Sequence, residues 1–180
     1  MTLTALPPTV SDDHLPDTAV AGVELHRYLG LLRRHATTVA VVTAPGQHGG
    51  PPVGFTATSF TSVSLRPQLV SFCLDRDSSS WPTVAQARHV AIHLLADGQE
   101  ELARTFAARG VDRFADASLW RHGPYGTPLL HGVLALLICE VVQRIPAGDH
   151  AIVLGRPVSA EHRPGEPLLH HMGGYTALAH

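Results

Sequence analysis

Apolar residues along the chain are grouped in short runs that have the length of β-strands. Runs rich in β-branched and aromatic residues alternate with segments rich in Gly, Pro and Ser, which favour turns. The runs span residues 37–44, 53–60, 68–74, 89–96, 132–144, 151–158 and 167–178. These apolar runs are not each followed by a helical segment. The pattern therefore predicts neighbouring antiparallel strands and not a parallel β/α sheet.

Two helices are predicted near the strands of the first half. Residues 21–35 carry apolar side chains at i, i+3, i+4 and i+7, which is typical of an amphipathic helix. These side chains are Leu25, Tyr28, Leu29 and Leu32. Residues 78–88 ("SSSWPTVAQAR") predict a short helix with Ser80 or a neighbour as its cap and Pro82 in its first turn.

A third helix is predicted over residues 97–110. Asp97 is expected to cap it, Glu100 stands three residues on as in a capping box, and Gly110 closes its end. Strands still dominate, so the predicted fold class is mainly β. The expected architecture is a small antiparallel barrel flanked by two or three helices.

Composition sets limits on size and partners. The chain has 180 residues, 44% of them hydrophobic, which suits one domain with a substantial core. Its formal charge of −2, without a long run of one sign, gives no footprint for nucleic acid or an anionic membrane. We expect residues 1–17, polar and Pro-rich, to form a mobile arm, and residues 18–180 to form the domain. No signal peptide or membrane-spanning run is evident, so a cytoplasmic protein is expected.

Several kinds of chemistry are disfavoured. The serines lack the GxSxG pattern of a nucleophile elbow, and no phosphate-binding GK[ST] loop is present. His89 and His93 would lie about 13 Å apart on a strand, too far to share one zinc, and no metal site is predicted. Cys73 and Cys139 sit in apolar runs, as buried unreactive thiols do.

Hydroxyl side chains gather in two places, each just beyond an apolar run. They are Thr56, Thr58, Ser59, Thr61, Ser62 and Ser64 in the first segment and Ser78, Ser79 and Ser80 in the second. Neutral hydroxyls and free backbone N–H groups can hold a phosphate, and a helix N-terminus adds the positive end of its dipole. Because Thr is also common in strands and Ser at helix caps, a purely structural role remains open.

Two further groups have both a structural and a functional interpretation. Gly148, Asp149 and His150 suit a tight turn between strands, and a single His there could be structural. Arg113 follows the third helix in a charged cluster that could be solvated or could contact a ligand.

The order of these segments resembles the flavin reductase family. "TTVAVVTA", "PVGFTATSFTSVSLRPQLVSFCLDRDSSSWP", "HVAIHLLADGQEELARTFAARGVDRFA", "GDHAIVLGRP" and "PLLHHMGGY" follow one another as in these small NAD(P)H:flavin oxidoreductases. The resemblance covers residues 24–176. It implies an FMN-binding split β-barrel, usually a homodimer, that reduces FAD or FMN with NADH or NADPH. The reduced flavin would serve a separate flavin-dependent monooxygenase.

The resemblance also implies roles for single residues. His150, in the segment that matches the family's GDH motif, is expected to be a positioning residue on the nicotinamide side. The sequence departs from the family where Gly is common at Thr38, Asn at His93 and a basic or aromatic residue near Met172. The implied flavin contacts are Val53, Gly54, Phe55, Thr56, Thr58, Ser59, Cys73, Leu74, Asp75, Ser78, Ser79, Ser80 and Arg113. The implied dinucleotide contacts are His150, Gly173, Gly174 and Tyr175.

Hydride transfer from nicotinamide C4 to flavin N5 needs neither a protein nucleophile nor a metal, which agrees with the absence of both kinds of motif. Two alternatives remain at this stage. One is a split-barrel protein with tightly bound flavin that acts on another small substrate, and the other is a non-enzymatic flavin carrier. The choices between FAD and FMN and between NADH and NADPH also remain open.

Overall fold

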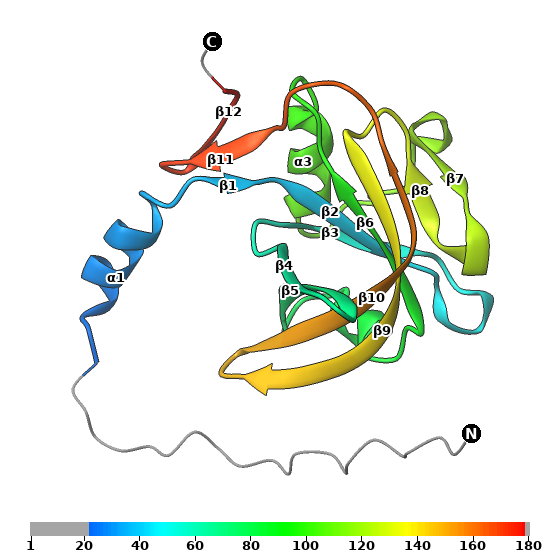
Figure 1. Ribbon diagram of the computed structural model, residues 1–180, viewed down its shortest axis with the longest axis horizontal. Coiled ribbons are helices and arrows are strands. Elements are labelled where there is room, and N and C mark those ends of the chain that lie inside the picture. Colours follow the sequence, from blue (N-terminus) through cyan, green and yellow to red (C-terminus); the bar gives the residue numbers. More distant parts are fainter. Residues whose placement is uncertain (1–21, 179–180) are drawn as a thin grey trace.

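The computed structural model describes residues 22–178, and the predicted arm, residues 1–17, lies outside the described residues. Most regular structure is β, as predicted, and it centres on one seven-stranded antiparallel sheet (Figure 1). In spatial order its strands are β3 (Val53–Ala57), β2 (Ala40–Ala44), β6 (His89–Leu94), β9 (Ala135–Ala147), β10 (His150–His162), β5 (Gln68–Asp75) and β4 (Thr61–Leu65).

Two small sheets and three helices complete the described part of the chain. β1 (Thr37–Thr38) pairs with the hairpin of β11 (Leu169–His171) and β12 (Gly174–Thr176), and β7 (Trp120–His122) pairs with β8 (Pro128–Leu130). The helices are α1 (Leu25–Leu32), α2 (Trp81–Val84) and α3 (Glu100–Ala107). Short 3-10 turns occupy Gln47–Gly49, Ala117–Leu119 and Pro124–Gly126.

The large sheet curls until its two ends meet through side chains. Phe55 of β3 and Phe72 of β5 pack with ring centroids 5.9 Å apart, although their strands lie near opposite ends of the sheet. Ser59, just after β3, accepts a hydrogen bond from the backbone N–H of Cys73 in β5 at 2.9 Å. One face of the sheet thus encloses an apolar core, as expected of a small barrel.

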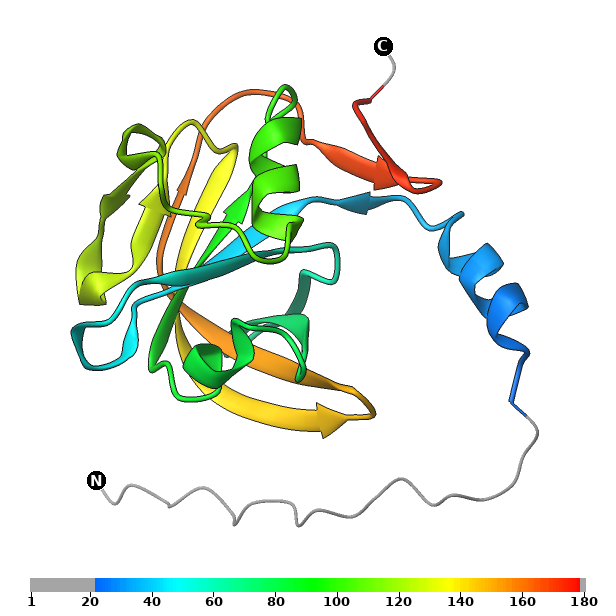
Figure 2. The ribbon, with the colours of Figure 1, turned by 180° about the vertical axis from the view of Figure 1, so that it is seen from behind.

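Alternation along β2 serves two cores. Ala40 and Val42 point into the barrel, whereas Val41 points to the opposite face and packs with Phe106 of α3. Thr56 of β3 fixes the helix further, because its hydroxyl donates to the backbone carbonyl of Ala103 at 2.7 Å. Figure 2 shows α3 lying beside β2 and β3 on this outer face.

The predicted caps of two helices differ from the structure. Ser80 occupies the N-cap position of α2, but its hydroxyl accepts from no backbone N–H of the helix and donates to the carbonyl of Gly54. α2 is one turn long, so the expected N-terminal phosphate site has little dipole behind it. α3 begins after Gln99, and Asp97 instead accepts from the backbone N–H of Gly98, so the predicted capping box is wrong.

Several strands begin or end at other residues than predicted. The predicted last strand is a hairpin, in which Met172 and Gly173 form the turn with positive φ at both positions, 51° and 84°. A further strand, β4, lies between the predicted runs 53–60 and 68–74, where no strand was predicted. β9 has the predicted length but lies three residues further along the chain, because the turn after it shrinks to Gly148 and Asp149. β10 is longer than predicted and continues to His162.

α1 is a helix, as predicted, but its apolar stripe does not contribute to the core. None of its residues is buried, and Leu25 and Leu29 are 70% and 50% exposed. Figures 1 and 2 both show the helix standing apart from the sheet. Within residues 22–178, no helix has the length and apolar character required to cross a membrane.

Candidate functional site

The outer edge of β3 offers backbone groups to a ligand. β3 is an end strand of the sheet and pairs only with β2. Because the carbonyl of Gly54 accepts from Ser80, it points away from β2, and the N–H of the same residue points to the same side. By alternation, the N–H of Thr56 also points outward. Two amide donors of the predicted flavin segment are thus directed toward the loop that follows β5.

Gly54 is also required for packing. A Cβ atom at this position would lie 2.6 Å from Cε1 of Phe106, a ring that is fully buried against β2. Only a residue without a side chain lets α3 approach β3 this closely. The same contact places the C-terminal half of α3 beside the predicted flavin residues.

Arg113 joins the separate parts of the predicted site. Its Nη1 donates to the Ser80 hydroxyl at 3.4 Å, and its Nη2 donates to the carbonyl of Ala108 at 2.5 Å. Its Nε is buried and has no hydrogen-bond partner among the described residues. Burial lowers the pKa of the guanidinium from its ordinary value. An unpaired cationic donor at this place suits an anionic group of a ligand.

The second hydroxyl segment is a compact turn. The carboxylate of Asp75 accepts from the backbone N–H of Asp77 at 2.8 Å, and the Ser78 hydroxyl accepts from the N–H of Ser80 at 3.3 Å. The hydroxyls of Ser78 and Ser80 therefore stabilise the backbone of this segment. Ser79, like Thr58 of the first segment, is exposed.

The Gly148–Asp149 turn lies against this segment. The Arg76 backbone N–H and guanidinium donate to the carbonyls of Asp149 and Gly148, at 3.0 and 2.7 Å. In the β5–β10 register, His150 is opposite Asp75. Its Nδ1 lies 2.6 Å from the Asp149 carboxylate, and that hydrogen bond lowers the pKa of the Asp149 carboxyl. The structure thus groups His150 with the predicted flavin residues.

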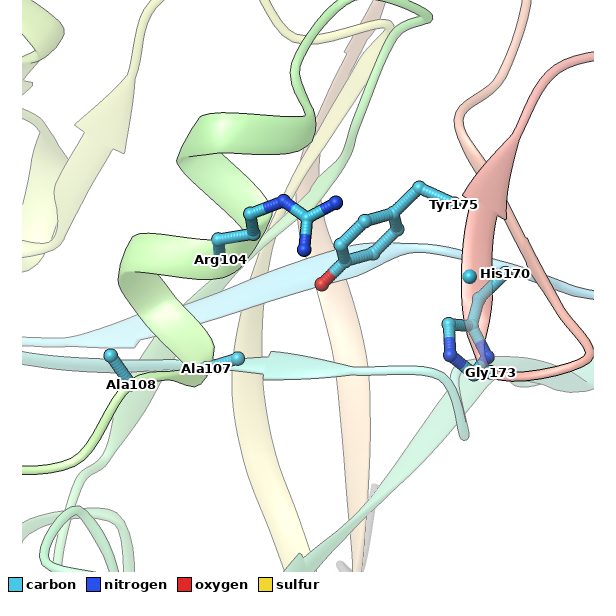
Figure 3. A pocket seen from close by; sticks show the side chains of 7 residues that line it. Arg104, Ala107, Ala108, His170, Gly173 and Tyr175 are labelled. Carbon is cyan, nitrogen blue, oxygen red and sulfur yellow. The ribbon is translucent and has the colours of Figure 1, made fainter.

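A cavity of about 450 Å³ opens between α3 and the C-terminal hairpin (Figure 3). The guanidinium of Arg104 lies over the ring of Tyr175, with Cζ 5.1 Å from the ring centroid. Burial raises the pKa of the Tyr175 hydroxyl. The lining residues are Arg104, Ala107, Ala108, His170, Gly173, Gly174 and Tyr175.

This cavity contains three of the four predicted dinucleotide contacts. Gly173, Gly174 and Tyr175 line it, whereas His150 does not. Figure 1 shows the tip of the β9–β10 hairpin at the lower left and the β11–β12 hairpin at the upper left, apart from one another. A single chain therefore does not bring His150 together with the other three residues.

Sequence reasoning missed Arg104, Ala107, Ala108 and His170 as lining residues. No motif marks them, and their position depends on where α3 meets the last hairpin. The cavity adjoins the predicted flavin residues through Ala108, whose carbonyl accepts from Arg113. Among residues 22–178, no group of three His, Cys, Asp or Glu side chains could hold a metal ion.

The chain is similar to known proteins over most of its length. Residues 32–179 match the family model described as a flavin reductase like domain. The chain is 46% identical over 153 residues to an NADH:FMN oxidoreductase of Rhodococcus qingshengii, which covers 82% of this chain and 79% of that protein. It is 34% identical over 165 residues to the HsaB reductase subunit of a flavin-dependent monooxygenase of Rhodococcus jostii, covering 90% and 83%.

A solved structure extends the comparison to the fold. The NADH:FAD oxidoreductase SgcE6 of Streptomyces globisporus, in complex with NAD and FAD fragments, superposes with a TM-score of 0.80 at 36% identity. The match covers 86% of this chain and 92% of that one. The fold and the family define an oxidoreductase of the flavin reductase class. The chain belongs to the flavin reductase like family.

Proposed function

We propose that the protein uses NADH to reduce FMN or FAD and releases the reduced flavin. The observation that carries this proposal is the link made by Arg113 between Ser80, beside the predicted flavin strand, and Ala108, in the cavity that contains Gly173 to Tyr175. Two predicted ligand sites thus share one supporting side chain. The similarity to proteins named NADH:FMN and NADH:FAD oxidoreductases supports the choice of reactants.

The residues present fit a flavin. The outward N–H groups of Gly54 and Thr56 suit the carbonyl oxygens and ring nitrogens of an isoalloxazine, and the unpaired Nε of Arg113 suits a phosphate. Thr58 and Ser79 are exposed hydroxyls on the same two segments. Two predicted flavin contacts, Phe55 and Leu74, are instead buried in the barrel core. We assign the other predicted contacts on these two segments to the site, namely Val53, Ser59, Cys73, Asp75, Ser78 and Ser80.

A bound flavin would supply the acceptor, since its N5 takes a hydride from C4 of the nicotinamide. The protein's contribution is then orientation. β3 would hold the isoalloxazine ring of the flavin by its edge, and the cavity beside Tyr175 would hold the nucleotide. The nicotinamide ring would then stack on the isoalloxazine at roughly 3 to 3.5 Å. We retain His150, the first residue of β10, as a positioning residue on the nicotinamide side.

The partner we propose is a separate flavin-dependent monooxygenase that takes up the reduced flavin. Support comes from the reductase subunit of such an enzyme in Rhodococcus jostii, which is similar over most of this chain.

We place the reaction in the cytoplasm, where reduced nicotinamide is regenerated. The two free cysteines, Cys73 and Cys139, fit that compartment.

We further propose a homodimer. α1 is an eight-residue helix with an exposed apolar stripe, and so short a helix is marginal in water without a packing partner. The end strand β4 also exposes Val63 and Leu65. A second copy of the chain could cover both surfaces.

The test of the activity is a steady-state assay that crosses NADH and NADPH with FMN and FAD, followed by the loss of flavin absorbance without oxygen. We expect multiple turnovers with NADH. The Arg113→Gln variant should raise the KM for flavin about tenfold, because it removes a charge-assisted hydrogen bond to the ligand. No acceleration over buffer would refute the proposal. Binding of flavin without NADH oxidation would identify a carrier. Yellow protein that does not turn over added flavin would identify a tightly bound cofactor.

A further inference from the structure

Arg104 is the one guanidinium among the residues that line the cavity beside Tyr175. Recognition of NADPH normally uses an Arg side chain, because the 2′-phosphate is a doubly charged anion. The state of Arg104 therefore bears on which dinucleotide the cavity accepts.

The guanidinium is already engaged by carboxylates of its own helix. Its Nη2 lies 3.7 Å from the Glu100 carboxylate and its Nε lies 3.7 Å from the Glu101 carboxylate. The remaining face of the group lies over the Tyr175 ring (Figure 3). Two negative charges surround one positive charge, so the net charge of this cluster at the cavity edge is −1.

We propose that Glu100 and Glu101 make the cavity select a dinucleotide without a 2′-phosphate. They occupy Arg104, and they repel a second anion at the same place. This inference rests on the proposed function, because it assumes that the cavity holds the dinucleotide. The groups are partly or largely exposed, with the Glu101 side chain at 93%, so salt must weaken the effect.

The experiment compares the ratio of kcat/KM for NADPH to that for NADH. In Glu100→Gln/Glu101→Gln we expect this ratio to rise roughly tenfold at 20 mM ionic strength, and to rise less at 0.5 M. Because both substrates are measured on one preparation, a loss of folded protein cancels from the ratio. Glu161→Gln removes a carboxylate from the far end of β10, outside the lining of this cavity, and should leave the ratio unchanged.

A triple variant identifies the cation. Adding Arg104→Gln to the double variant should abolish the gain for NADPH. Arg33 is the competing candidate, since its Nη2 lies 3.6 Å from where a Cβ of Gly173 would be. The proposal is overturned if the ratio does not change in the double variant, if the gain persists in the triple variant, or if Arg33→Gln in place of Arg104→Gln abolishes it. Absence of NADH turnover in the unaltered protein would instead refute the proposed function.

Discussion

His93 is fully buried where β2, β6 and β8 meet. Its Nδ1 lies 3.0 Å from the carbonyl of Val41, and its Nε2 accepts a hydrogen bond from the backbone N–H of Leu130 at 3.1 Å. Only the neutral ring with the proton on Nδ1 satisfies both contacts. Burial accordingly lowers the pKa of His93 to about 4, with the Val41 hydrogen bond opposing that shift.

This side chain should make stability depend on pH. Between about pH 6.5 and pH 4 the unfolded chain binds a proton at His93 that the folded chain does not bind. The stabilisation is therefore complete above pH 6.5 and is lost as the pH falls toward 4, by about 3 kcal/mol in total. Urea unfolding at intervals between pH 7.5 and 4 measures the loss.

The matched variant is His93→Asn, which keeps a polar side chain and removes the titration. It should be less stable at pH 7.5 but should lose about 3 kcal/mol less between pH 7.5 and 4. An identical pH slope in both proteins would show that His93 does not control it.

Among the secondary-structure elements, α1 has an apolar stripe that packs against no other part of the described chain. Its stripe of Leu25, Tyr28, Leu29 and Leu32 is exposed, so its apolar surface has no partner among the described residues. Fully burying one such side chain stabilises an interface by roughly 1.5 to 3 kcal/mol. The helix can thus contribute substantially to association while adding little to the fold of one chain.

Leu29→Asp should therefore convert the proposed dimer to a monomer, because burying an unpaired carboxylate is costly. Sedimentation should change from about twice the chain mass of 19.2 kDa to that mass, with far-ultraviolet dichroism preserved. Arg27→Asp, on the opposite side of the same helix, is the control and should remain dimeric. A monomer in the unaltered protein, or a dimer in Leu29→Asp, would contradict the role given to α1.

At the scale of the whole molecule, closure of the curled sheet isolates Cys139 from solvent. Its side chain is fully buried in the barrel core, and burial raises the pKa of the thiol to about 12. The reactive thiolate is thereby reduced about a thousandfold relative to a thiol of pKa 9. Cys73 on β5 is only partly buried.

A disulfide exchange reagent should consequently report barrel opening. In Cys73→Ser, the remaining Cys139 should react only as fast as the protein unfolds and should become fully reactive in 6 M guanidinium. Rapid reaction of Cys139 under native conditions would mean that the sheet opens locally. Cys139→Ser, which retains Cys73, provides the comparison.

Much of the architecture follows from local patterns in the sequence. The apolar runs predicted the central strands, the 3.6-residue stripe predicted α1, and the order of motifs indicated the family that the comparisons confirm. The capping box at Asp97 failed because Gln99 is the N-cap residue of α3, and the Asp97 carboxylate accepts from the N–H of Gly98 instead.

The residues along the sequence thus determined the strands, the mainly β class and the family. Only the tertiary structure decided which side chains meet. Arg113 reaches Ser80, and Arg104 reaches Tyr175, across separations that no local periodicity encodes. The physical reason is that strand and helix patterns reflect interactions within a few residues, whereas a binding cavity forms where distant segments pack. His150 demonstrates the difference, since its motif is local but its neighbours are set by the β5–β10 register.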